Sequence, residues 1–143
     1  MPITPTNLID QLVRDEGEVL HAYQDSLGFW TIGSGILIDP RKGGGITHEE
    51  NLYLLGNRAE KARAYVRTQF PWTLSLDEVR RAALENMAFN MGAHLGEFRK
   101  FLAHLEAREY EDAAKEMVNS VWAIQTGPRA HRLAEQIRTG EWV

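Results

Sequence analysis

Glu16, Asp25 and Thr31 are the residues of this chain whose types and spacing could support acid–base chemistry. Glu16 stands where a short helix is predicted to end, Asp25 ends a predicted strand, and Thr31 lies on the next strand. A hairpin turning at 26–28 would place Asp25 and Thr31 side by side. Acids at helix ends and turns are most often solvated, and spacing alone favours that interpretation. One detail favours chemistry, because the negative end of a helix dipole disfavours an ionised carboxylate, which suits a general acid.

The predicted helix that carries Glu16 is short and amphipathic. Thr6 or Asn7 can cap its start, and Gly17 is suited to end it. Its apolar stripe consists of Leu8, Ile9, Leu12 and Val13.

The following segment predicts a small antiparallel sheet, because it is rich in strand-forming residues and interrupted by a turn at 26–28. Gly33 and Gly35 indicate bends or close approaches of the backbone, and 41–45 is predicted to be a loop. The strand-forming residues are Val19, Tyr23, Phe29, Trp30, Thr31, Ile32, Ile36 and Ile38.

The rest of the chain predicts helices. Thr47 with Glu50, and Ser75 with Glu78, have the spacing of capping boxes at helix starts. We expect helices at about 47–55, 57–69, 76–91, 97–107, 109–120 and 128–138.

This order of elements predicts an α+β fold in a single domain that covers 1–143. We expect a sheet lobe at about 17–55, a connector helix at about 57–69, and a larger helical lobe at about 70–143 that also includes the N-terminal helix. Two lobes joined by a helix leave a cleft between them, where ligands usually bind.

Three ordered blocks of sequence resemble the phage lysozymes of glycoside hydrolase family 24. The first, from Asp15 to Gly35, holds the glutamate, aspartate and threonine at the family's spacing. The second, 79–92, is similar to the family's central core helix almost residue for residue. The third comprises Trp122, Gln125-Thr126, Arg129-Ala130 and 138–142. The resemblance implies a lysozyme-like fold and a muramidase, an endolysin that acts on bacterial peptidoglycan.

The resemblance implies a role for each residue of the first block. Glu16 would protonate the glycosidic oxygen between N-acetylmuramic acid and N-acetylglucosamine. Asp25 would orient or activate a water and stabilise the oxocarbenium-like transition state, and Thr31 would help to hold that water. The resemblance also implies inversion at the anomeric carbon. Inversion requires carboxyl groups roughly 6.5–9.5 Å apart, one of them protonated and the other ionised.

The resemblance also implies substrate-binding residues. Leu37, Phe89 and Asn90 match cleft-lining positions, and core packing is an equal alternative for Phe89. Asn90 could hydrogen-bond an acetamido group. Arg129 matches an arginine near the acid, where its charge would favour the ionised carboxyl and oppose the helix-end effect; the sequence leaves that balance open.

Two departures from the family concern the sheet lobe. Ile36 stands where the family often has a histidine, so an ion pair used there is absent. The segment from Leu37 to Thr47 is much shorter than in the family's best-known member, which predicts a smaller sheet lobe and weakens the assignment of sugar subsites.

The composition of the chain limits the classes of partner and cofactor that we expect. The formal net charge is −4, and the acids are concentrated in 1–55, which argues against nucleic acid. The chain has no cysteine, and its five histidines lack a metal-binding spacing, so we expect no disulfide, metal or cofactor. No apolar run approaches the roughly 20 residues of a membrane span, and 1–6 do not resemble a signal sequence. We therefore expect a monomer without stable membrane association, held in the host cytoplasm until a holin gives it access to the cell wall; a component of a phage particle is the alternative.

Two rival functions remain. A lytic transglycosylase cleaves the same bond with one acid and leaves an anhydro product. A non-catalytic peptidoglycan-binding module would have kept only the fold. Asp25 and Thr31 at the family's spacing argue against the transglycosylase. Retention of all three residues, Glu16 included, argues against the binding module, which would not need them.

Overall fold

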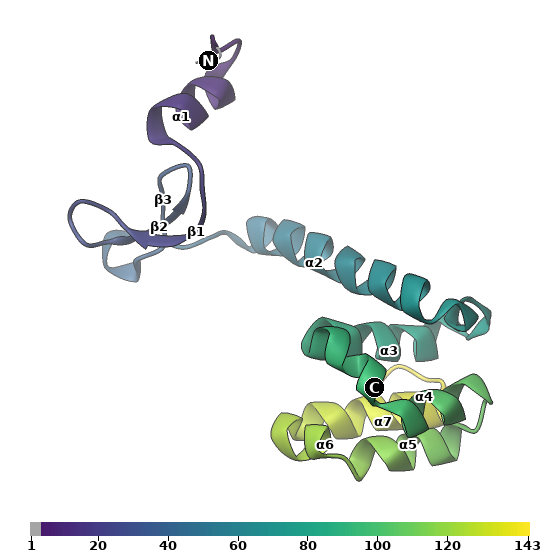
Figure 1. Cartoon of the computed structure of the whole chain (residues 1–143). Coiled ribbons are helices and arrows are strands. Elements are labelled where there is room, and N and C mark those ends of the chain that lie inside the picture. Colours follow the sequence, from purple (N-terminus) through teal and green to yellow (C-terminus); the bar gives the residue numbers. More distant parts are fainter. Residues whose placement is uncertain (1–3) are drawn as a thin grey trace. The chain divides into compact units, whose positions relative to one another are not determined.

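The computed structural model describes residues 4–143, which fall into two units that meet in sequence between Tyr53 and Leu54 (Figure 1). Residues 1–3, part of the segment that we expect not to be a signal sequence, lie outside the described residues. The structure is α+β, as predicted, with a three-stranded antiparallel sheet in the first unit and a set of helices in the second. The single domain, with the N-terminal helix in the helical lobe and a cleft between lobes, stays a prediction.

Helix α1 (Leu8–Glu16) has the ends that the sequence predicts. Of the two candidate caps, Asn7 serves: its side-chain oxygen accepts a hydrogen bond from the Asp10 N–H at 2.9 Å. Gly17 ends the helix at a φ of 75°, and its N–H donates to the Val13 carbonyl. Glu16 is therefore the last helical residue, which fixes where its side chain begins.

The sheet consists of β1 (Val19–Gln24), β2 (Trp30–Gly33) and β3 (Ile36–Leu37), paired in that order. The hairpin turns where predicted, and the Asp25 N–H donates to the Phe29 carbonyl at 2.8 Å. The cross-strand partner of Thr31 is Tyr23, however, two residues before Asp25. Since side chains alternate along a strand, Asp25 and Thr31 share a face of the sheet as diagonal neighbours rather than as a cross-strand pair.

The predicted loop after β3 begins as a short 3₁₀ helix, η1 (Pro40–Lys42), because Asp39 caps it. The buried Asp39 carboxylate accepts from the Arg41 N–H at 3.0 Å and from Arg41 Nε at 2.9 Å. A Cβ on Gly44 would lie 2.6 Å from the Leu37 carbonyl oxygen, so only glycine fits there. The shortened segment is thus a tightly folded turn.

Helix α2 (His48–Gln69) is a single helix, where the sequence predicted two that break at Gly56. A glycine inside a helix costs only about 1 kcal/mol relative to alanine, which the rest of a long helix can offset. Its start is as predicted: the Glu50 N–H donates to the Thr47 hydroxyl at 3.1 Å.

After α2, the second unit continues with five α-helices and two 3₁₀ helices. Its elements are η2 (Pro71–Ser75), α3 (Glu78–Met91), η3 (Gly92–Glu97), α4 (Arg99–Glu106), α5 (Tyr110–Val118), α6 (Val121–Thr126) and α7 (Pro128–Thr139).

Two expectations about these helices were wrong. Asp77 caps α3 by accepting from the Arg80 N–H at 3.0 Å, whereas Ser75 donates to the Trp72 carbonyl instead of forming the predicted capping box. Helix α6 was not predicted; Ser120 starts it by accepting from the Ala123 N–H, which ends the preceding helix earlier than expected.

The second unit has its own hydrophobic core. Alanines with no exposed surface, such as Ala83, Ala113 and Ala130, allow the helix backbones to approach closely. Replacing a large, fully buried apolar side chain by alanine costs about 2–5 kcal/mol in general, so the large side chains of this core determine the stability of the unit. The largest fully buried apolar side chains are Phe101, Leu84, Met87, Leu95, Leu105, Met117, Ile137 and Val66.

Arg80 on α3 forms hydrogen bonds with the C-terminal end of α7. Its Nε donates to the Ile137 carbonyl at 2.6 Å and Nη2 donates to the Arg138 carbonyl at 3.1 Å. The guanidinium also lies over the Tyr110 ring, 3.5 Å from its centroid. One side chain thus satisfies the last carbonyls of a helix and packs against an aromatic ring.

Within 4–143, the helices are either too short or too polar to cross a lipid bilayer.

Candidate active site

The Glu16 side chain lies against the turn between β2 and β3. A Cβ built on Gly35 would be 2.8 Å from Glu16 Oε2 and 3.2 Å from its Cδ. Gly35 also has a φ of +73°, a conformation that L-residues rarely adopt. The sequence flagged this glycine as a close approach of the backbone, and the group that approaches is the carboxylate of the proposed acid.

Asp25 is held by the hairpin that it starts. It is half-buried, and its Oδ1 accepts from the Leu27 N–H at 2.9 Å and from the Phe29 N–H at 2.8 Å. This is the side-chain-to-backbone bonding that aspartate makes in turns. The turn therefore fixes the orientation of the carboxylate relative to the sheet.

Thr31 is the buried polar residue of the sheet, with 3% of its surface exposed. It lies on the central strand, opposite Tyr23 on one side and Leu37 on the other. Its hydroxyl donates to the Phe29 carbonyl at 3.1 Å, which leaves the hydroxyl oxygen as an acceptor. Asp25, Thr31 and Leu37 therefore share one face of the sheet.

In the second unit, Arg129 and Phe89 line a hollow of about 330 Å³ between α2, α3 and α7. Arg129 donates through Nε and Nη2 to Asn86 Oδ1, at 3.0 and 2.6 Å. Phe89 is 45% exposed, so it is not a buried core residue of this unit. The sequence analysis missed Asn86, although it lies within the second family-like block.

Glu85 lines the same hollow and lies 3.8 Å from Arg63. Burial raises the pKa of Glu85, and the charges of Arg63 and Arg81 only partly offset that effect. The hollow thus combines apolar walls with a carboxylate that is more easily protonated than a solvated one.

Asn90 belongs to a different hollow, of about 710 Å³, whose walls include Met91, His94 and Gln125. Trp122 Nε1 donates to Asn90 Oδ1 at 2.9 Å. The amide oxygen is therefore engaged, and the amide nitrogen is the group left to donate to a ligand.

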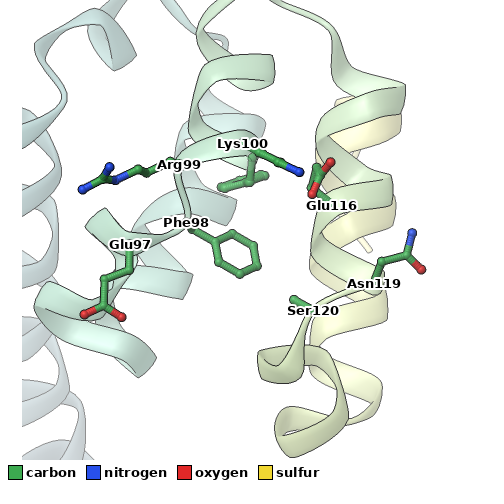
Figure 2. A pocket seen from close by; sticks show the side chains of 8 residues that line it. Glu97, Phe98, Arg99, Lys100, Glu116, Asn119 and Ser120 are labelled. Carbon is green, nitrogen blue, oxygen red and sulfur yellow. The ribbon is translucent and has the colours of Figure 1, made fainter.

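A third hollow, of about 380 Å³, shares Glu97 and Phe98 with the hollow of Asn90. Figure 2 shows the Lys100 side chain extending toward Glu116 on helix α5, with the Phe98 ring below both in this view. The sequence analysis singled out no residue here, because isolated charges on amphipathic helices resemble an ordinary solvated surface.

The proposed site residues thus form two sets. Glu16, Asp25, Thr31 and Leu37 are positioned by α1 and the sheet of the first unit. Phe89, Asn90 and Arg129 are positioned by helices of the second.

Comparisons with known proteins agree on one family. The model of the phage lysozyme family matches residues 13–138. Two relatives in Dictyostelium discoideum, probable T4-type lysozymes 2 and 1, are 34% and 32% identical, over 94% of this chain and 95% of each relative. The pre-baseplate central spike protein Gp5 of Enterobacteria phage T4 is 30% identical over 94% of this chain, which corresponds to 28% of that longer protein.

Proposed function

The chain belongs to the phage lysozyme family and is a glycoside hydrolase of the lysozyme type, and we propose that it hydrolyses the β-1,4 bond between N-acetylmuramic acid and N-acetylglucosamine in bacterial peptidoglycan. The observation that carries this proposal is the first unit itself. There a helix-terminal glutamate packs on a glycine turn, and an aspartate and a threonine share one face of the adjoining sheet.

In the proposed mechanism, Glu16 acts as general acid and donates its proton to the glycosidic oxygen as the C–O bond breaks. Asp25 orients or activates the attacking water and stabilises the oxocarbenium-like transition state. The Thr31 hydroxyl oxygen accepts a hydrogen bond from that water while the same hydroxyl donates its own hydrogen bond to the Phe29 carbonyl. Gly35 keeps the Glu16 carboxyl in place because it has no Cβ to displace it.

For substrate binding, we propose Leu37, Phe89, Asn90 and Arg129. Leu37 and the half-exposed Phe89 offer apolar surface to the sugar rings. The Asn90 amide nitrogen suits the carbonyl of an acetamido group, since Trp122 occupies the amide oxygen. Arg129, oriented by Asn86, offers a cation to carboxylates of the substrate.

The decisive experiment incubates purified protein with peptidoglycan and identifies the new glycan ends by mass spectrometry. Wild type should produce hydrated, reducing N-acetylmuramic acid ends, and Glu16→Gln should lose this activity by a factor of about 10² or more. Glu18→Gln, an exposed glutamate outside the proposed site, is the matched control and should retain it. Anhydro ends would establish a lytic transglycosylase instead, and tight sedimentation without cleavage would establish a binding module.

We further propose that the protein acts as a monomeric endolysin, which reaches the wall from the host cytoplasm when a holin opens the inner membrane. Added from outside, it should clear suspensions of bacteria whose outer membrane has been permeabilised. Expressed inside a host, it should cause lysis only together with a holin. Lysis of the host on expression alone would contradict the dependence on a holin.

A further inference from the structure

We propose that the turn between α4 and α5 is a binding site for a divalent transition-metal cation, with Zn²⁺ as the best fit. Three possible ligands converge there: His104 from the last turn of α4, Glu109 from the turn, and Asp112 from the first turn of α5. One ligand atom from each, an imidazole nitrogen and two carboxylate oxygens, lies within 4.8 Å of the other two. None of these three residues belongs to the proposed active site.

The backbone of the turn keeps these side chains together. Arg108, between α4 and α5, has a φ of +62°, a left-handed backbone conformation that residues other than glycine rarely adopt. The Glu109 N–H then donates to the His104 carbonyl at 2.8 Å, and the His104 ring Nδ1 lies 3.4 Å from Glu109 Oε1. Two of the three ligands are therefore linked by both their backbone and their side chains.

The charges of the turn favour a cation. Two carboxylates held this close repel each other, and a divalent ion would replace that repulsion by attraction. The turn's own cation is engaged elsewhere, because Arg108 Nη2 donates to the Ser75 carbonyl at 3.1 Å and Nη1 lies 3.5 Å from the Tyr110 hydroxyl. The Arg108 guanidinium therefore does not occupy the position between the carboxylates of Glu109 and Asp112 where a cation would bind.

The set of ligands indicates which cation. Imidazole nitrogen together with carboxylate oxygen suits Zn²⁺ and its neighbours, whereas Mg²⁺ and Ca²⁺ prefer oxygen alone. Ligands of a tetrahedral zinc at about 2.1 Å lie roughly 3.4 Å from one another. Binding would therefore require the solvent-accessible side chains of Glu109 and Asp112 to rotate toward the ion. Three protein ligands would leave a fourth position for water.

Sequence spacing did not reveal this site, because one histidine and two acids spread over a helix end, a turn and a helix start match no metal motif. Acids in the first turn of a helix have another explanation, since they favour the positive end of its dipole without any metal. The experiment must therefore separate metal binding from that role.

The test is isothermal titration of the metal-free full chain with zinc chloride at pH 7.5. We expect one site with micromolar affinity, weakened at least tenfold by His104→Gln and by Asp112→Asn. His94→Gln is the matched control: His94 lies 3.4 Å from Glu97 in an exposed pair that lacks the third ligand, so this variant should bind as wild type does. Zinc should also shift the imidazole ¹⁵N resonances of His104 more than those of His94.

Two results would overturn the proposal: binding weaker than millimolar, or equal weakening by His94→Gln and His104→Gln. Unchanged far-ultraviolet circular dichroism in each variant excludes loss of folding as the cause. The Glu16→Gln variant should bind zinc as wild type does, so failure of the proposed function and failure of this inference are distinguishable.

Discussion

Replacing Gly35 by alanine should inactivate the enzyme more than it destabilises it. The new Cβ would lie 2.8 Å from Glu16 Oε2, well inside the carbon–oxygen contact distance. The carboxyl must therefore move by roughly half an ångström or more. A misplacement of about 1 Å can cost about 100-fold in rate, so we expect kcat to fall by about 10- to 100-fold, or about 1.4–2.7 kcal/mol in activation free energy.

The left-handed backbone adds a separate cost to stability. An alanine at a φ of +73° is disfavoured by about 1–2 kcal/mol whatever its surroundings. Gly33→Ala is the matched control, because Gly33 has a φ of +68° and its added Cβ would meet only Ile36 Cδ1, at an ordinary 3.6 Å. The two variants share the backbone penalty and differ in contact with the acid.

The assay measures kcat and KM on dye-labelled peptidoglycan, together with urea unfolding of each variant. Gly33→Ala and Gly35→Ala should lose similar stability, while only Gly35→Ala should lose kcat beyond its change in the folded fraction. If Gly35→Ala kept the kcat of Gly33→Ala, Gly35 would not position Glu16, or Glu16 would not be the acid.

Three further predictions concern stability. Gly44→Ala should lower the unfolding free energy by more than about 2 kcal/mol, because its Cβ would meet backbone atoms at 2.6–2.7 Å. Gly43→Ala, with open space around its Cβ, should cost only the penalty of its left-handed backbone. Equal losses of stability in the two variants would contradict a steric clash at Gly44. Burial raises the pKa of Glu85, so the ionised carboxylate destabilises the folded state at a pH above that pKa. Glu85→Gln should therefore raise the urea midpoint of unfolding at pH 7, and this gain should shrink toward pH 4. A gain that does not depend on pH would refute the assignment. Arg80→Met should lower the unfolding free energy by about 2–4 kcal/mol, since it leaves two helix-end carbonyls without their donor; a loss no larger than that of Arg81→Met would show that the guanidinium contacts are dispensable.

The sequence predicts this structure best where signals are local. The apolar stripe of α1, its asparagine cap and the glycine that follows all lie within about ten residues, and the helix forms between them as predicted. The hairpin before Trp30 is equally local. The expected break at Gly56 was wrong because one glycine in a helix costs only about 1 kcal/mol, which the other residues of a long helix can offset. The capping box predicted for Ser75 was wrong because Asp77 directly precedes the first residue of α3 and caps the helix instead.

The candidate site can be proposed from the sequence to the extent that its residues carry family spacing. Glu16, Asp25 and Thr31 come from one continuous block, so the sequence alone suggests them. The diagonal placement of Asp25 and Thr31 depends on which hairpin residues pair, and turn residues alone do not fix that register. The link between Arg129 and Asn86, 43 residues apart, depends on how two helices pack. Such contacts leave no periodic signal in the chain.

The contact between Arg80 and the end of α7 also bears on how the second unit folds. Arg80 meets carbonyls 57 and 58 residues later in the chain, and closing so long a loop costs conformational entropy that local helix formation does not repay. During synthesis, Arg80 therefore leaves the ribosome long before its partners exist. Helices α3 to α6 can form in the meantime, but their shared core is complete only when α7 docks, because α7 contributes the buried residues Ala130, Leu133, Ala134 and Ile137.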